Sequence, residues 1–149
     1  MKRGNVTQEV TIETLGYYLD RALFGMIRLL NHTLAGSGLD LKHSQFTVLE
    51  ALSVKNGISQ TELSKILGKD PAAISRTLDY LEKKNYIVRE SANGSRNRVL
   101  LTDKGKEIVP KLKEIADKVT EIGFTGFRES KKAETMKSLT KIYHNTSLQ

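Results

Sequence analysis

The residues whose types and spacing best suit a chemical role form two clusters. The first lies in a segment with helical spacing and combines small side chains with hydrogen-bonding ones: Ala72, Ala73, Ser75, Arg76 and Thr77. Alanine lets a helix approach base edges and thymine methyl groups, and arginine, serine and threonine supply the donors and acceptors that read bases. The cluster therefore predicts a helix that contacts DNA. The plainer alternative is a solvated helix face.

The second cluster stands at the tip of a predicted β-hairpin. Ser95, Arg96 and Arg98 lie where a turn-forming run gives way to a β-prone one. Basic side chains at such a tip suit phosphates or a minor groove. Charged residues also protect hairpin edges from aggregation, which is the alternative explanation. We favour DNA contact, because this hairpin directly follows the helix of the first cluster.

The sequence shows no residue pattern typical of catalysis or metal binding. The chain contains no cysteine, which excludes disulfides, thiolate zinc sites and thiol-based redox sensing. His32, His43 and His144 are isolated from other potential metal ligands. We find no Ser/His/Asp triad, phosphate-binding glycine loop or dinucleotide fingerprint. We therefore expect no enzyme, no metal site and no cofactor.

Size and charge fit one domain with a polyanionic partner. The chain has 149 residues and a net charge of +7, and the stretch 83–104 carries six basic residues against two acidic ones. No apolar run approaches the roughly 20 residues of a membrane span. The basic N-terminus leads into an amphipathic segment and not into a secretory leader. We therefore expect a cytoplasmic protein without a membrane partner.

The apolar spacing predicts a mainly α domain with one hairpin. Apolar residues recur every three or four positions in most segments, and two β-prone runs flank a turn. The expected helices cover about 9–36, 44–55, 60–67, 71–84, 103–122 and 130–144, with the hairpin at 86–101. Ser59 and Glu62 have the spacing of a capping box, and Pro71 suits a first helical turn. The short third helix is expected to bury Leu63, Ile66 and Leu67.

The first and last helices present more apolar surface than one chain can cover. Tyr18, Ile27 and Leu29 widen the apolar stripe of the first helix. The last helix carries an apolar face with few expected partners: Met136, Leu139, Ile142 and Tyr143. We expect segments 9–36 and 106–146 to form the dimerisation helices of a homodimer.

The order of helices and hairpin, together with several short motifs, resembles the MarR family of winged helix-turn-helix regulators. The matching segments are Leu39–Leu49, Ser59–Ser64, Ala73–Lys84 and Leu101–Gly105. Each segment alone is moderately specific, but their shared order and spacing are strong evidence. The resemblance implies one MarR-like domain over residues 1–149, with a winged helix-turn-helix DNA-binding lobe at 41–105.

The family resemblance also implies a function. It implies a homodimer that places two recognition helices on successive major grooves of a pseudo-palindromic operator in double-stranded DNA. Such proteins usually repress, and many release DNA when a small aromatic or anionic effector binds between the dimer region and the DNA lobe. Tyr17, Arg21 and His32 fall near that region as candidate effector-pocket residues, with core or dimer packing as the alternative. The hairpin departs from the family pattern, because no aspartate stands before Arg96 to orient it.

A second function stays open at the level of sequence. A winged helix can serve as a protein–protein interaction module without specific DNA binding. Ala72, Ala73 and Ile74 are uncharged and favour that alternative. Arg76 and the basic hairpin argue against it, so a DNA-binding transcription regulator is the leading hypothesis.

Overall fold

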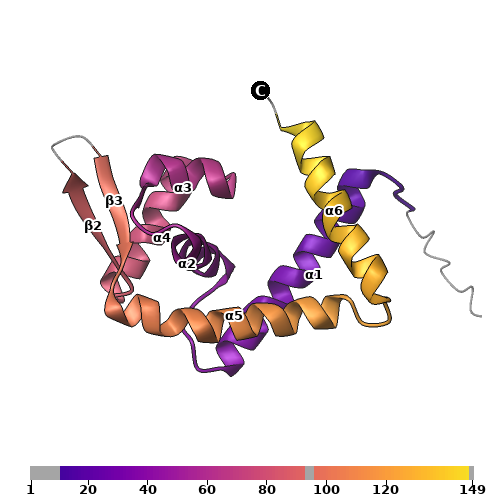
Figure 1. Ribbon diagram of the computed structural model, residues 1–149, viewed down its shortest axis with the longest axis horizontal. Coiled ribbons are helices and arrows are strands. Elements are labelled where there is room, and N and C mark those ends of the chain that lie inside the picture. The colour runs from indigo at the N-terminus through magenta and orange to yellow at the C-terminus, as the bar shows by residue number, and fades with distance from the viewer. Residues whose placement is uncertain (1–10, 93–95, 148–149) are drawn as a thin grey trace, which may run out of the picture.

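The computed structural model describes residues 11–92 and 96–147. The elements are α1 Leu15–Gly36, α2 His43–Val54, β1 Ile58–Ser59, α3 Gln60–Leu67, α4 Pro71–Lys83, β2 Ile87–Ala92, β3 Arg96–Leu101, α5 Asp103–Gly123 and α6 Glu129–Thr146. α2, α3, α4 and the sheet form a lobe at one end, α1 and α6 stand at the other end, and α5 runs along both (Figure 1). The predicted mainly α fold with a small β-wing is confirmed.

Side-chain caps fix where helices begin. The hydroxyl of Thr14 accepts a hydrogen bond from the first turn of α1 at 3.3 Å. The hydroxyl of Ser59 accepts one from the Glu62 amide at 3.1 Å, which is the first of the two hydrogen bonds of the predicted capping box. The Glu62 carboxylate binds Lys55 Nζ at 2.5 Å, which ties the start of α3 to the end of α2. Such caps satisfy amides that have no partner inside the helix.

The sheet contains a strand that the sequence did not reveal. Its order is β1-β3-β2, and all neighbours are antiparallel. β2 and β3 form the predicted hairpin, with Ile87 opposite Leu101 at its base. β1 pairs with the other edge of β3, with Ile58 opposite Val99. This third strand anchors the hairpin to the lobe, because both edges of the base of β3 are hydrogen-bonded.

One core holds the lobe of α2, α3, α4 and the sheet together with α1 and α5. Its members come from every part of the lobe and from the two long helices. Fully buried side chains include Leu34, Val48, Leu49, Leu52, Ile58, Leu63, Leu78, Leu81, Ile87 and Val99. Each side chain of this size stabilises the fold by about 1.5–3 kcal/mol when it leaves water. α4 and the hairpin are therefore positioned by the same packing that fixes α1 and α5.

Two expectations for the helices are wrong. α1 begins at Leu15 and not near residue 9, because Thr14 caps it there; residues 9 and 10 lie outside the described part. Ile66 is 53% exposed and not buried. The inner side of α3 carries Leu63 and the half-buried Leu67, and successive residues on a helix are about 100° apart. Ile66 is therefore turned away from the core.

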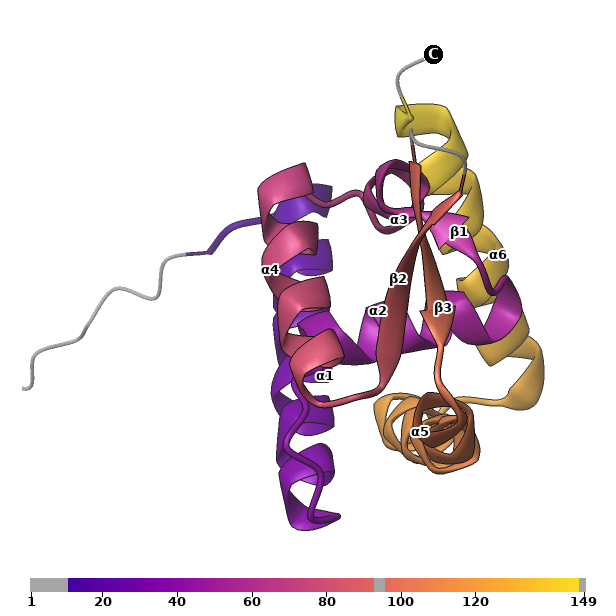
Figure 2. The same ribbon diagram turned by 90° about the vertical axis from the view of Figure 1, so that its left-hand side faces the viewer.

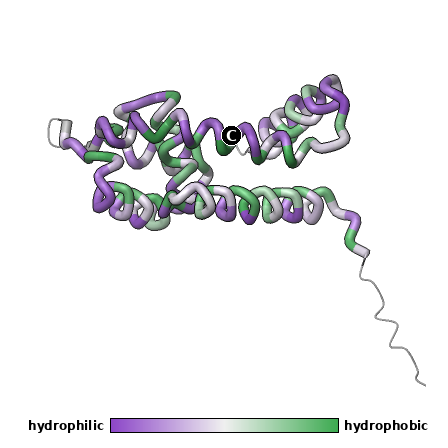
Figure 3. The backbone as a smooth tube through the Cα atoms, turned by 90° about the horizontal axis from the view of Figure 1, so that it is seen from below, coloured by the Kyte–Doolittle hydropathy of each residue, from purple (hydrophilic) through white to green (hydrophobic). Residues whose placement is uncertain are grey.

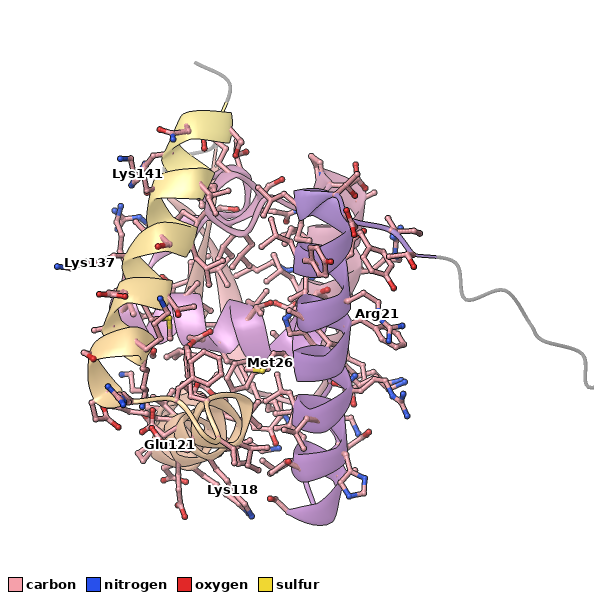
Figure 4. The ribbon with its side chains drawn as sticks, turned by 90° about the vertical axis from the view of Figure 1, so that its right-hand side faces the viewer. Arg21, Met26, Lys118, Glu121, Lys137 and Lys141 are labelled. Atoms are coloured by element: carbon pink, nitrogen blue, oxygen red, sulfur yellow. The ribbon has the colours of Figure 1, made fainter. Side chains whose placement is uncertain are left out.

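α1 and α6 leave large apolar side chains uncovered in the single chain. α6 has no buried residue, and Met136, Leu139 and Tyr143 are exposed on it. α1 buries only part of its surface and exposes Leu15, Tyr18, Leu23 and Phe24. Its tube alternates between hydrophobic and hydrophilic colours in Figure 3, and Figure 4 shows α1 and α6 as separate columns.

The described residues contain neither a helix that could span a membrane nor a cluster of potential metal ligands. None of the helices in residues 11–92 and 96–147 has the length and apolarity needed to cross a bilayer. No group of three or more His, Cys, Asp or Glu side chains in those ranges could hold a metal ion.

Candidate nucleic-acid interface

The recognition helix candidate is α4, and its two sides differ in character. Asp70 caps it by accepting a hydrogen bond from the Ala73 amide at 3.2 Å, and Pro71 occupies the first turn as predicted. Ile74 and Leu78 are buried against the lobe. The opposite side is open and lies beside the hairpin on one face of the molecule (Figure 2). Because the Asp70 carboxylate occupies the start of the helix, attraction of phosphate must come from side chains.

The predicted DNA-contact residues on α4 do not all lie on its open side. Ala72 and Arg76, one turn apart, are exposed. Ala73, Ser75 and Thr77 are half-buried. The Thr77 hydroxyl donates to the Ala73 carbonyl at 3.0 Å, so it keeps only acceptor capacity for a base or phosphate. Arg76 is thus the residue of this cluster best placed to reach outward.

The hairpin cluster is only partly described. Arg98 is exposed on β3, opposite Glu90 on β2 and Ser59 on β1. Arg96 begins β3, but its side chain and all of Ser95 lie outside the described residues. Within the described part, neither Arg76 nor Arg98 forms an ion pair. Both cations are therefore available to an anionic partner.

Arg89 joins the hairpin to α4, a role that the sequence did not indicate. Its Nη2 donates to Glu82 Oε2 and to Asp79 Oδ1, both at 2.6 Å, and its Nε donates to Glu82 Oε2 at 3.2 Å. The Arg89 side chain is mostly buried. Its hydrogen bonds lower the pKa of Glu82, and Glu82 and Asp79 raise the pKa of Arg89. We call these three residues the Arg89 clamp.

Replacing Arg89 with methionine is expected to destabilise the fold by about 1–2 kcal/mol, because two neighbouring carboxylates lose their shared partner. The clamp's contribution is present at neutral pH and is lost in acid, since the pKa of Glu82 is lowered in the folded state. Urea unfolding between neutral pH and pH 3 measures both effects. Lys106→Met, on an exposed site of α5, is the control. If Arg89→Met and Lys106→Met have the same free energy of unfolding at neutral pH, the Arg89 clamp does not stabilise the fold.

Some cations of the predicted basic patch at 83–104 are engaged in contacts within the fold. Lys84 Nζ donates to Asp40 Oδ2 at 2.9 Å, and the Tyr80 hydroxyl donates to the Asp40 carbonyl at 2.7 Å. Lys104 Nζ donates to the Lys84 carbonyl at 2.8 Å at the end of α4. With Arg89 also engaged, these contacts tie α4 to the α1–α2 connection and to α5. They leave fewer free cations than the sequence suggested.

The open side of α4 is poorly suited to docking a protein. Ile74, which favoured that alternative, is only 3% exposed and belongs to the core. The outward residues are Ala72, Arg76, Asp79 and Lys83. A surface that is small and charged lacks the apolar anchors of protein interfaces.

The predicted effector residues all lie on α1, on one side of the helix. Tyr17 and Arg21 line a shallow depression together with Phe24. His32 is three turns beyond Arg21, or roughly 16 Å along the axis, so the same small molecule cannot touch both within one chain. Arg21 points away from the molecule in Figure 4. The structure therefore brings Tyr17 and Arg21 together but not His32.

Comparisons with known proteins agree with this geometry. A family model described as MarR family matches residues 39–96, which run from just before α2 to the start of β3. An uncharacterised HTH-type transcriptional regulator of Bacillus subtilis (strain 168), YybA, is 28% identical over 103 residues, covering 68% of each chain.

Solved structures extend the likeness to nearly the whole chain. A MarR transcriptional regulator from Methanosarcina mazei Go1 is 27% identical with a TM-score of 0.82, covering 91% of both chains. Wild-type MarR from E. coli is 27% identical with a TM-score of 0.74, covering 89% of this chain and 98% of that one. Sequence motifs, fold and relatives lead to one conclusion: the chain is similar to the MarR family of winged helix-turn-helix transcription regulators.

Proposed function

We propose that this regulator is a homodimeric repressor that binds a pseudo-palindromic operator in double-stranded DNA. The observation that carries the proposal is that α4, which bears the exposed Arg76, lies beside the hairpin, which bears the exposed Arg98 (Figure 2). In this proposal α4 enters the major groove, with Ala72, Ala73, Ser75, Arg76 and Thr77 toward the bases. Ser95, Arg96 and Arg98 contact phosphates or the minor groove beside it.

The second copy is proposed to cover the apolar residues of α1 and α6. Monomeric proteins rarely leave contiguous apolar surface of this kind open to water. Leu15, Tyr18 and Phe24 on α1 are each more than half exposed, and so is Tyr143 on α6. A homodimer that pairs these helices buries both faces at once and gives DNA two recognition helices related by a two-fold axis.

Replacing Leu139 with glutamate is expected to convert the dimer to a monomer, because it places a carboxylate in the proposed apolar interface. Sedimentation equilibrium at micromolar concentration then gives one chain of 16.7 kDa for the variant and twice that mass for the wild type. The affinity of Leu139→Glu for operator DNA, selected from a random duplex pool, is expected to be at least about tenfold lower than that of the wild type.

The control for Leu139→Glu is Lys137→Glu. Lys137 points away from α1 in Figure 4, so a glutamate there leaves the proposed interface intact. A wild type that sediments as a monomer, or a dimeric Leu139→Glu variant, contradicts the proposed interface.

Control by a small molecule is part of the proposal. The depression beside Tyr17 and Arg21 lies on α1, which we propose to be shared between the dimer interface and the DNA lobe. A ligand bound at Tyr17, Arg21 and His32 of the two copies would alter the relative placement of the recognition helices. The expected result is weaker operator binding when the effector is present.

A further inference from the structure

A groove between α2 and α5 is more enclosed than the depression on α1. One section of about 210 Å³ opens between α1, α2 and α5, and a second of about 340 Å³ continues between α2 and α5. Phe46, Glu50 and Ala116 line both sections, so they form the continuous α2–α5 groove. Volumes of this order accommodate small ligands.

The lining of the α2–α5 groove is apolar with one dominant charge. In the section next to α1, the polar lining residues are His43, Thr47, Glu50 and Thr120, and Glu50 is the acidic one. Lysine and arginine do not line that section. Lys113 and Asp117 line the second section and offset one another in charge. The groove as a whole therefore carries net negative charge from Glu50.

Glu50 has no partner for its carboxylate among the residues described by the structure. The Ser53 hydroxyl donates to the Glu50 backbone carbonyl at 2.6 Å and not to the carboxylate, and none of the ion pairs within residues 11–92 and 96–147 includes Glu50. Glu50 is exposed to solvent at the groove, although partial burial raises the pKa of its carboxyl. Burial, with a smaller effect of Lys69, lowers the pKa of His43, which leaves the imidazole neutral near neutral pH. His43 therefore does not neutralise Glu50.

From this lining we propose that the α2–α5 groove binds an organic cation with an apolar aromatic body, whose ammonium group pairs with the Glu50 carboxylate. The aromatic body lies against Phe46 and Ala116, the apolar residues common to both sections. An anionic ligand meets the unpartnered carboxylate and no cation in the section next to α1, so repulsion disfavours it. The inference names the ligand class for the proposed effector control and rests on that control for its biological role.

The test uses three probes that share one aromatic body and differ in charge: 1-naphthylmethylammonium, 1-naphthylmethanol and 1-naphthoate. Isothermal titration calorimetry measures their affinities for the full chain at neutral pH. We expect 1-naphthylmethylammonium to bind at least about tenfold more tightly than 1-naphthoate. The ammonium forms an ion pair with Glu50, whereas the carboxylate is repelled by it.

Variants assign that preference to Glu50. Glu50→Gln keeps the shape of the side chain and is expected to weaken the cation about tenfold while leaving the neutral alcohol unchanged. Glu50→Arg is expected to reverse the preference toward 1-naphthoate. Glu114→Gln removes a carboxylate from an α5 residue that does not line the groove and is expected to change nothing.

Two results overturn the inference: equal binding or non-binding of all three probes to the wild type, or an unchanged cation affinity in Glu50→Gln. Operator binding without any probe is measured on the same preparations. If operator binding is absent, the proposed function fails whatever the probes do. If operator binding is present and the charge preference is missing, only the ligand class fails.

Discussion

The Arg76→Ala variant is expected to lose about 1–3 kcal/mol of operator affinity at each half-site, which is at least about a fivefold increase in Kd per contact. Arg76 is exposed on the open side of α4, one turn from Ala72, and no carboxylate among the described residues competes for it. A guanidinium in that position can donate two hydrogen bonds to one guanine or to a phosphate. Because a homodimer carries two copies, the loss applies twice.

Fluorescence anisotropy with selected operator DNA measures the effect, and circular dichroism shows whether the variant is folded. Lys118→Ala removes the same formal charge from an exposed position on α5, so it reports the diffuse electrostatic contribution alone. We expect Lys118→Ala to weaken binding by less than about threefold. Equal losses from the two variants would show that Arg76 acts only through net charge.

The Gly105→Ala variant is expected to destabilise the fold by about 3 kcal/mol and to lower Tm by roughly 10 °C. A Cβ at Gly105 would overlap the Tyr86 carbonyl oxygen and lie 3.1 Å from Leu101 Cδ2. That carbonyl also accepts the Thr102 amide at 3.1 Å, and Thr102 in turn caps α5 through the Gly105 amide at 3.0 Å. The backbone is therefore held on both sides of the overlap and cannot move away cheaply.

The close approach at Gly105 also explains the Leu101–Gly105 motif in physical terms. It brings the start of β2 against the first turn of α5, and so it fixes the hairpin relative to the long helix. Gly36→Ala is the control, because a Cβ there meets nothing within 4 Å at the end of α1, and we expect stabilisation of up to about 1 kcal/mol. Thermal unfolding that shows Gly105→Ala as stable as the wild type contradicts the packing described.

Local patterns in the sequence were sufficient to predict the helices and the hairpin. Ser59 and Pro71 mark real helix starts, because capping and first-turn preferences depend on residues three or four positions apart. The apolar face of α6 was also predictable, because apolar residues on one face of a helix recur every three or four positions. The burial of Ile66 was predicted wrongly, because a helix of two turns has too few residues for its periodicity to fix the inner face.

Contacts between distant segments were not predictable from these patterns. β1 is two residues long and pairs with a strand 40 residues later, so no alternation could reveal it. Lys84 binds Asp40 from 44 positions away, and Arg89 reaches across to α4. The number of cations near the hairpin follows from the sequence. Only the fold shows which of them are bound within the chain and which face solvent.

The sequence predicted candidate DNA-contact residues on one helix but not which of them are exposed. The sequence placed five residues on one helix without resolving that Ala72 and Arg76 face outward while Thr77 donates back to its own helix. The α2–α5 groove could not be predicted either, because its lining comes from three helices that packing alone brings together.

Sequence-specific DNA binding by a dimer is tested by selecting DNA from a randomised duplex library with the purified protein at two salt concentrations and sequencing the bound fraction. We expect the bound DNA to share an inverted repeat whose half-sites are centred about one helical turn apart, roughly 10 base pairs, and to remain bound at the higher salt. Binding that is blind to sequence and lost at the higher salt would contradict this expectation, because charge alone would then explain the interaction with DNA.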